Sequence, residues 1–266
     1  MAAVDLEPRN AYEGVATAWA RGPAALYDKL ATVTIESVAP ELRGAIVLDL
    51  GAGTGALCRA LRVAEAIPVA VDTSRDMLGL IGDATALALV GDMCALPLTD
   101  GGLDAAVSGF AISHIDNPDH ALAEMRRVVR PGGRVIAAVF GAAPASASKD
   151  VVDEVARDYG YVPPSWYIAL KTRTEPLSNT PPLLKRRAES AGLVDIEIAD
   201  VTVDSGIDEP EAITAYRTGL AHIAPFVASL PESRRTEFIT RAVAAVRERG
   251  QPVRPRLLVL SSRAPA

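Results

Sequence analysis

The chain has 266 residues, a formal net charge of −6 and two cysteines, and apolar residues make up 49% of it. That length and apolar fraction suffice for one large domain with a packed core. The acidic balance argues against a nucleic-acid surface, and two cysteines do not indicate a disulfide scaffold. The apolar runs are too short to span a bilayer, and no signal-peptide pattern is present. We expect a cytoplasmic protein that binds neither nucleic acid nor membrane.

Short apolar runs alternate with helical periodicity through the middle of the chain. Residues 120–130 carry apolar side chains at helical spacing, and Pro118 and Pro131 are expected to start and stop that helix. Another helix is expected over 181–191. This alternation predicts an α/β fold with a mostly parallel sheet and helices on both faces. The predicted strands are 46–50, 67–71, 87–90, 103–108, 134–140, 193–199 and 256–261.

Three segments do not continue this alternation. Residues 9–39 are expected to be helical, and 142–179 begin with small residues and turn aromatic and proline-rich. Residues 205–251 contain two predicted helices, 209–222 and 231–249. We expect the first segment to form an N-terminal cap and the other two to form a lid. The sequence predicts a single domain, 1–266, whose sheet core comprises 45–141, 180–204 and 252–264.

Residues 46–55 combine a buried strand, a glycine turn and the start of a helix. Gly51, Gly53 and Gly55 follow directly on branched apolar residues. Glycine lets the backbone approach a ligand closely, and the N–H groups at the start of a helix can bind it. Asp72 closes the next apolar run, where its carboxylate is placed to hold ribose hydroxyls. These features predict a nucleoside-cofactor site.

The glycines alone fit two classes of cofactor. The spacing Gly51-x-Gly53-x-x-Ala56, with Asp72 about 20 residues further on, matches the dinucleotide fingerprint of nicotinamide enzymes. Asp49 opposes that interpretation, because such proteins keep an apolar residue there, and a third glycine follows at a spacing of two. An NAD(P)-dependent oxidoreductase is therefore kept as an alternative.

Two further motifs favour another family. Residues 91–97, Gly-Asp-Met-Cys-Ala-Leu-Pro, follow the third predicted strand, and residues 130–133, Arg-Pro-Gly-Gly, precede the fifth. With the glycine turn, they make residues 47–140 resemble class I S-adenosylmethionine-dependent methyltransferases, in the small-molecule branch of ubiquinone- and menaquinone-type enzymes. The resemblance implies a Rossmann-like, doubly wound, seven-stranded, mostly parallel sheet whose last strand inserts antiparallel beside the fifth. It also implies that helical cap and lid insertions form the substrate chamber.

The resemblance implies a role for each acidic residue at a strand end. Asp49 meets the ammonium group of S-adenosylmethionine, Asp72 takes both ribose hydroxyls, and Asp92 accepts the amino group of adenine. Met93 and Met77 pack against the two sides of the adenine ring. Without a ligand, Asp49 and Asp92 would serve only as turn acceptors. The expected cofactor-binding residues are Tyr12, Arg21, Asp49, Gly51, Ala52, Gly53, Gly55, Asp72, Thr73, Met77, Asp92, Met93 and Phe110.

The segment 108–115 leaves the fourth predicted strand over the expected cleft, since ligands in such sheets sit outside the carboxyl ends of strands. His114 in this segment is a candidate general base, because the unperturbed pKa of histidine, about 6.5, suits proton transfer near neutral pH. The alternative is that His114 caps the loop by bonding Asp116 or the backbone. We assign no metal ligand.

Aromatic residues outside the sheet are the candidates for a substrate site. Tyr12 and Arg21 are expected to close over the carboxylate of the cofactor, as N-terminal residues do in the family that the chain resembles. The same residue types also serve as packing anchors or at dimer interfaces. The expected lining of an apolar substrate pocket is Trp19, Tyr161, Trp166, Tyr167, His222 and Phe226.

The resemblance therefore implies methyl transfer from S-adenosylmethionine to a small, apolar or aromatic metabolite, at oxygen, nitrogen or carbon. An in-line displacement depends mainly on positioning the two reacting centres, so it needs no serine–histidine or paired-carboxylate constellation. A cyclase or rearrangement enzyme on the same fold is an alternative, as is a binding module, although the intact glycine turn opposes the latter. We expect a monomer or homodimer that acts in secondary metabolism.

Overall fold

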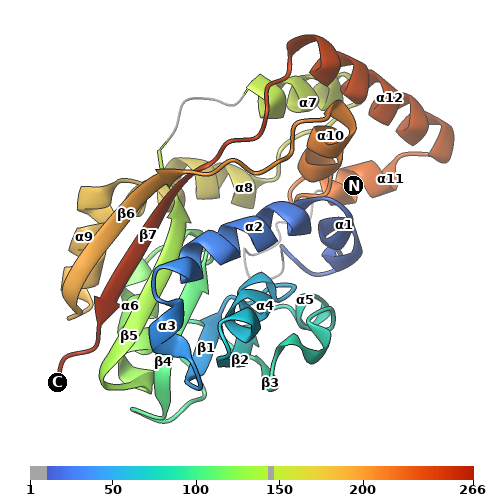
Figure 1. Cartoon of the computed structure of the whole chain (residues 1–266). Coiled ribbons are helices and arrows are strands. Elements are labelled where there is room, and N and C mark those ends of the chain that lie inside the picture. The colour runs from blue at the N-terminus through green and yellow to red at the C-terminus, as the bar shows by residue number, and fades with distance from the viewer. Residues whose placement is uncertain (1–10, 143–146) are drawn as a thin grey trace.

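The computed structural model describes residues 11–142 and 147–266, so residues 9–10 of the expected cap and 143–146 of the expected lid lie outside the described residues. A seven-stranded sheet in the order β3-β2-β1-β4-β5-β7-β6 forms its centre (Figure 1). β1 to β5 are parallel, and β7 runs antiparallel between β5 and β6. The predicted fold class is confirmed. The strands are β1 (Ile46–Leu50), β2 (Ile67–Asp72), β3 (Leu87–Val90), β4 (Leu103–Gly109), β5 (Val129–Phe140), β6 (Val194–Thr202) and β7 (Arg256–Arg263).

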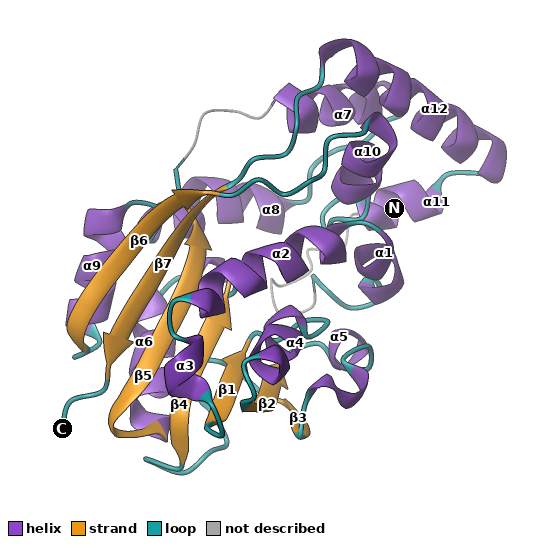
Figure 2. Ribbon diagram, viewed as in Figure 1, coloured by secondary structure: helices purple, strands orange, loops and turns teal. Residues whose placement is uncertain are grey.

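Helices cover both faces of the sheet (Figure 2). Three of them, α2 (Pro23–Glu36), α3 (Ala39–Leu42) and α4 (Ala56–Val63), pack on one face. The other face carries α6 (Pro118–Val128) and α9 (Pro181–Ser190). Within the described ranges, no helix is long and apolar enough to cross a membrane.

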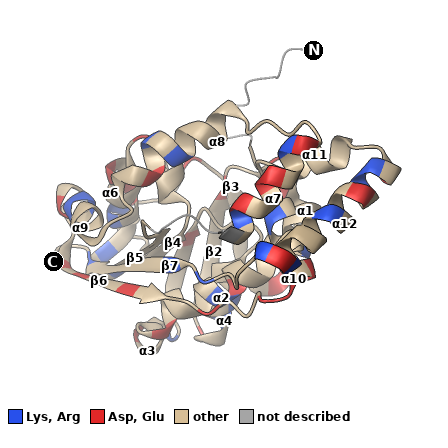
Figure 3. Cartoon of the chain, turned by 90° about the horizontal axis from the view of Figure 1, so that it is seen from above, with Lys and Arg blue, Asp and Glu red and all other residues tan. Residues whose placement is uncertain are grey.

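A second group of helices lies beyond the carboxyl ends of the parallel strands. α7, α10 and α12 pack on one another there. Ion pairs tie them together, such as Arg217 with Asp153 and Arg249 with Glu154. Figure 3 shows acidic and basic residues, coloured red and blue, along these helices. The group consists of α1 (Ala16–Arg21), α7 (Ala147–Asp158), α8 (Ser165–Ala169), α10 (Pro210–Thr218), α11 (Ala224–Ser229) and α12 (Glu232–Arg249).

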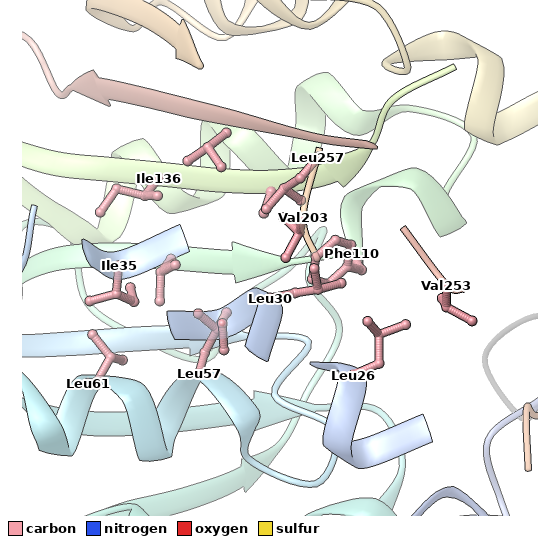
Figure 4. Packing of buried hydrophobic residues seen from close by; sticks show 14 of the residues in the cluster. Leu26, Leu30, Ile35, Leu57, Leu61, Phe110, Ile136, Val203, Val253 and Leu257 are labelled. Atoms are coloured by element: carbon pink, nitrogen blue, oxygen red, sulfur yellow. The ribbon is translucent and has the colours of Figure 1, made fainter. Parts of the chain in front are cut away.

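A large apolar core lies between the sheet and the N-terminal helices. Leu26 and Leu30 of α2 and Leu57 and Leu61 of α4 are buried in it (Figure 4). Burial of a leucine side chain contributes about 1.5–3 kcal/mol to folding, so α2 is held firmly on the sheet. Within the expected cap, 9–39, residues 23–39 therefore pack on the sheet, and Tyr27 and Ala31 of this part also line the cavity described below.

The predicted helix 209–222 was wrong at its end. α10 ends at Thr218, and α11 then begins at Ala224. Pro225 lies in the first turn of α11, where the missing N–H has no intrahelical partner to lose. Pro225 therefore marks the start of a new helix.

The expected loop before the fifth strand was also wrong. β5 begins at Val129, so Pro131 and Gly132 lie inside it. The pairing with β4 shifts register between Leu103 and Ala105, which makes the start of β5 a bulge that tolerates a proline. The connection between β2 and β3 is irregular, and it holds only α5 (Arg75–Leu78) and a 3-10 turn (Gly82–Ala84).

Candidate functional site

The turn after β1 holds three glycines in the left-handed region. Gly51, Gly53 and Gly55 have φ angles of 73°, 53° and 84°, which residues with a side chain rarely adopt. At Gly51, a Cβ would also lie 2.2 Å from Cβ of Ala111. The turn therefore requires glycine, and it brings the start of α4 close to the loop that follows β4.

Gly51→Ala should lower the free energy of unfolding by about 2–4 kcal/mol, through backbone strain and overpacking together. Gly44→Ala is the matched control, because Gly44 has a φ of 74° and nothing within 4 Å of an added Cβ. The control isolates the backbone strain and should lose about 1 kcal/mol. Urea unfolding of both variants measures the difference, and equal losses would contradict the close approach at Ala111.

A cavity of about 570 Å³ opens at the carboxyl ends of β1, β2 and β4. The glycine turn forms its floor on one side, and aromatic side chains line the other. Gly55 is the one residue of the predicted turn set that does not line the cavity; it caps α4 instead. The predicted site residues that line the cavity are Tyr12, Trp19, Asp49, Gly51, Ala52, Gly53, Asp72, Thr73, Met77, Asp92, Met93, Phe110, His114 and Trp166.

Asp49 lies at the end of β1 with a side chain that is 0% exposed. Its Oδ2 accepts a hydrogen bond from Sγ of Cys58 at 3.1 Å, whereas its Oδ1 has no partner among the described residues. Burial is the main cause that raises the pKa of Asp49 to about 7. A buried carboxylate with a free oxygen at a cavity wall fits a cationic ligand group, because such a group would supply the missing partner.

Asp72 ends β2 and supports the glycine turn. Its Oδ2 accepts from the backbone N–H of Gly53 and its Oδ1 from that of Ser74, both at 2.8 Å. Burial is also the main cause that raises the pKa of Asp72. Each carboxylate oxygen can accept a second hydrogen bond, so Asp72 can hold two neighbouring hydroxyls while it braces the turn.

The opposite end of the cavity has the residues expected around adenine. Asp92 accepts from the backbone N–H of Cys94 at 2.9 Å through Oδ1, and Met93 lines the wall beside it. Met77 is buried, at 2% exposed, and its Cε would lie 3.8 Å from a Cβ at Gly53. The two methionines therefore border the same cavity from different elements, α5 and the loop after β3.

Aromatic rings make a continuous wall above the glycine turn. Ring centroids lie 5.7 Å apart for Tyr12 and Trp19, 4.7 Å for Trp19 and Tyr27, and 5.3 Å for Tyr27 and Phe110. Trp166 joins the wall 6.4 Å from Tyr12. Phe110 has a φ of 63°, an unfavourable conformation for a non-glycine residue that is held at the end of β4. This wall makes one half of the cavity apolar.

His114 lines the cavity on the 3-10 turn after β4 (Ile112–His114). Its Nε2 lies 3.4 Å from the hydroxyl oxygen of Tyr12. Burial lowers the pKa of His114 to about 4, so the imidazole is neutral at pH 7 and able to accept a proton. The alternative partner, Asp116, pairs with Arg173 instead.

Four residues expected in the substrate pocket lie away from the cavity. Nδ1 of His222 lies 2.6 Å from the hydroxyl of Tyr161, and the His222 ring stacks on Tyr167 with centroids 3.8 Å apart. Phe226 packs beside Tyr161 at 5.3 Å. These rings pack on one another inside the helical group, where Nε2 of His222 has no partner among the described residues. None of the four lines the cavity, so the expectation that they do was wrong.

Arg21 is also misplaced by the sequence prediction. It lies exposed at the end of α1 and does not line the cavity. The cation at the cavity wall is Arg173, in the π-helical turn Leu170–Thr174, which no periodicity in the sequence indicated. Tyr27 of α2 also lines the cavity without having been predicted as a site residue, because its aromatic spacing was equally consistent with packing.

Residues 48–137 match the family model described as "Methyltransferase domain". Over 116 residues the chain is 36% identical to a demethylmenaquinone methyltransferase of Clavibacter sepedonicus, covering 42% of this chain and 47% of that protein. Over 148 residues it is 34% identical to the demethylmenaquinone methyltransferase of Mycobacterium tuberculosis strain CDC 1551, covering 52% and 62%. The chain thus spans about half the length of the curated relatives it matches.

Solved structures share the fold. Phosphoethanolamine N-methyltransferase 2 of Haemonchus contortus, in complex with S-adenosyl-L-methionine, is 17% identical with a TM-score of 0.56, covering 89% of this chain and 52% of that chain. The [4+2]-cyclase SpnF is 19% identical with a TM-score of 0.53, covering 90% and 82%. Residues 48–137 thus match a methyltransferase domain, and the chain shares the fold of these solved structures.

Proposed function

We propose that this protein transfers a methyl group from S-adenosylmethionine to a small, apolar or aromatic metabolite. The observation that carries the proposal is a single cavity with two unlike halves. One half presents the glycine turn and the free oxygen of buried Asp49, and the other is walled by aromatic rings. The first half suits a nucleoside with an ammonium group, and the second suits an apolar acceptor.

Each part of the cofactor has a residue that fits it. Asp49 would meet the ammonium group, Asp72 the ribose hydroxyls, and Asp92 with Met93 and Met77 the adenine ring. A pyrophosphate would instead meet the buried carboxylate of Asp49, whose like charge would repel it. This charge argues against a nicotinamide cofactor, and no observation favours a cyclase over a methyltransferase.

When bound, S-adenosylmethionine supplies an electrophilic methyl group on a sulfonium centre. The chain's own part is to hold the acceptor beside it and to exclude water, which can supply several kcal/mol of the barrier. Neutral His114 would take the proton from an acceptor hydroxyl. Where that hydroxyl binds at Nε2, it replaces the Tyr12 hydroxyl, which lies 3.4 Å from this nitrogen. We propose that the enzyme works in the cytoplasm, as a monomer or homodimer, in secondary metabolism.

Calorimetric titration tests the proposal most directly. Purified protein is titrated with S-adenosylmethionine, S-adenosylhomocysteine and NADPH side by side. Micromolar binding of the first two without binding of NADPH is the expected result and justifies an acceptor screen read by mass increase of one methyl group. Binding of NADPH alone would overturn the proposal.

Asp72→Ala should weaken binding of S-adenosylhomocysteine by about 1–3 kcal/mol, because buried hydroxyls lose their acceptor. Asp83→Ala is the matched control, since Asp83 is exposed in the same connection. The same calorimetric titration compares the two variants. An affinity of Asp72→Ala equal to that of the control would remove Asp72 from the site.

A further inference from the structure

We propose that Cys58 is a positioning residue for the cofactor site, whose thiol orients the Asp49 carboxylate and sets the pH range in which an ammonium-bearing ligand binds. The inference rests on the proposed function, because Asp49 is the group that would meet the ammonium of the cofactor. Nothing in the sequence pattern marks Cys58 as more than a core residue of α4.

The contact between the two residues is fully buried. Cys58 and Asp49 are both 0% exposed, and Sγ donates to Oδ2 at 3.1 Å. Oδ1 lacks a partner in the described part of the chain, although Asp49 lines the cavity. The thiol therefore engages one carboxylate oxygen and leaves the other available to a ligand.

A thiol suits this position because it is a weak donor. A lysine or arginine there would neutralise the carboxylate and remove its attraction for an ammonium group. An apolar side chain would remove the side-chain donor and leave the carboxylate only the backbone donor of residue 58, and burial would then favour the protonated, uncharged carboxyl. The weak donor keeps the orientation of the carboxylate while leaving its charge for the ligand.

The groups packed around Asp49 agree with this role. The hydrogen bonds from Cys58 and the charge of Arg59, both on α4, lower the pKa of Asp49, and Asp72 at the end of β2 raises it, while burial outweighs them all. On β4, the carboxylate of Asp104 accepts from the backbone N–H at the opposite end of β1. Cys58 thus supplies the nearest donor that counteracts burial.

Among the described residues that line the cavity, no arginine or lysine is left to compete for Asp49. Arg173 is paired with Asp116, and burial keeps His114 neutral because it lowers the pKa to about 4. Burial also raises the pKa of Tyr12 well above its ordinary value, and Asp92 is a further acid. Around the cavity, within the described residues, the charge of Asp49 is left to be matched by a bound ligand.

The pH dependence follows from the sign of these effects. An ammonium group binds the ionised carboxylate, so affinity should fall as the pH drops through about 7, the pKa of free Asp49. Loss of the thiol donor raises that pKa and moves the midpoint of the affinity profile upward. Cys58→Ser, which places a stronger donor at the same site, should leave the midpoint unchanged or lower it.

The test is calorimetric titration with S-adenosylhomocysteine between pH 5.5 and 8.5. Cys58→Val is close in volume to the wild type and has no donor, and it should bind about tenfold more weakly at pH 7, with a midpoint about half a unit to one unit higher. Cys58→Ser should stay within about twofold of the wild type. A thermal unfolding curve of each variant, with its midpoint above the titration temperature, verifies that folded protein is measured.

A second ligand separates positioning from a general loosening of the pocket. Methylthioadenosine has the adenosine part but no ammonium group, so its affinity should be the same in the wild type and Cys58→Val. An equal loss of affinity for both ligands in Cys58→Val would overturn this inference and leave the proposed function standing. Equal pH midpoints of the affinity profile in the wild type and both variants would do the same. A wild-type protein that binds no S-adenosylhomocysteine overturns the proposed function and this inference with it.

Discussion

Replacing Asp49 with asparagine should abolish useful cofactor binding and yet stabilise the fold at neutral and alkaline pH. We expect affinity for S-adenosylhomocysteine at pH 8 to fall about 100-fold or more, because a buried charge-assisted contact with the ammonium group is lost. Calorimetry on the two proteins measures this directly. The asparagine keeps an oxygen that can accept from Cys58, so the local packing is preserved.

The stability change has a definite pH dependence. The pKa of Asp49 is raised from 3.8 to about 7 by burial, so the folded state holds the proton more tightly than the unfolded chain does. Ionisation therefore costs the wild type stability progressively as the pH rises from about 4 to 7, and the loss stays constant above that. The variant lacks this loss and should gain on the order of 4 kcal/mol in the free energy of unfolding at pH 8.

Urea unfolding at pH 4, 6 and 8 is the measurement. The two proteins should be nearly equal in stability at pH 4 and diverge as the pH rises. A variant that is less stable than the wild type at pH 8 would mean that Asp49 is held by a partner that the structure does not record. The combination of weaker binding and higher stability would mark Asp49 as a residue retained for function.

His114→Ala should slow methyl transfer to a hydroxyl acceptor by about 10²–10⁴-fold, if the acceptor screen identifies one, because the proton then has no base. Cofactor affinity should change little, since Asp49 and Asp72 hold that ligand from the other side of the cavity. Single-turnover rates at saturating cofactor give the comparison. Unchanged rates in the variant would assign His114 a structural role in the loop after β4.

The pH profile of the wild type offers an independent check on His114. Its pKa is lowered to about 4 by burial, so the imidazole stays neutral and active down to about pH 5. At saturating cofactor, the rate should therefore be flat between pH 8 and pH 5.5. A decline centred near pH 6.5 would show an exposed, ordinary histidine instead.

The cofactor half of the cavity was predictable because its signals are local. Strand, turn and acid follow one another within 46–55, and the rule for strand ends brings Asp72 and Asp92 to the same edge. The contact between Cys58 and Asp49 was not predictable, because it depends on how α4 is rotated against β1. Only the packed structure sets that rotation.

The substrate half was predicted less well for a physical reason. An aromatic side chain is stable either at a cavity wall or against another ring, and spacing does not distinguish the two. Trp166 lies at the cavity wall, whereas Tyr161 packs against the ring of Phe226. Arg173 was not predicted as a site residue because it lies in a π-helical turn, whose period differs from that of an α-helix.

The position of β7 has a consequence for the order in which the chain can fold during synthesis. Among the described strands, β6 pairs with β7 alone. β5 pairs with β4 on one side and with β7 on the other. Residues 194–202 are made more than 50 residues before their sheet partner, 256–263. Until the ribosome releases that last strand, the nascent chain exposes two unpaired strand edges, while β1 to β4 can already form the nucleoside-binding half.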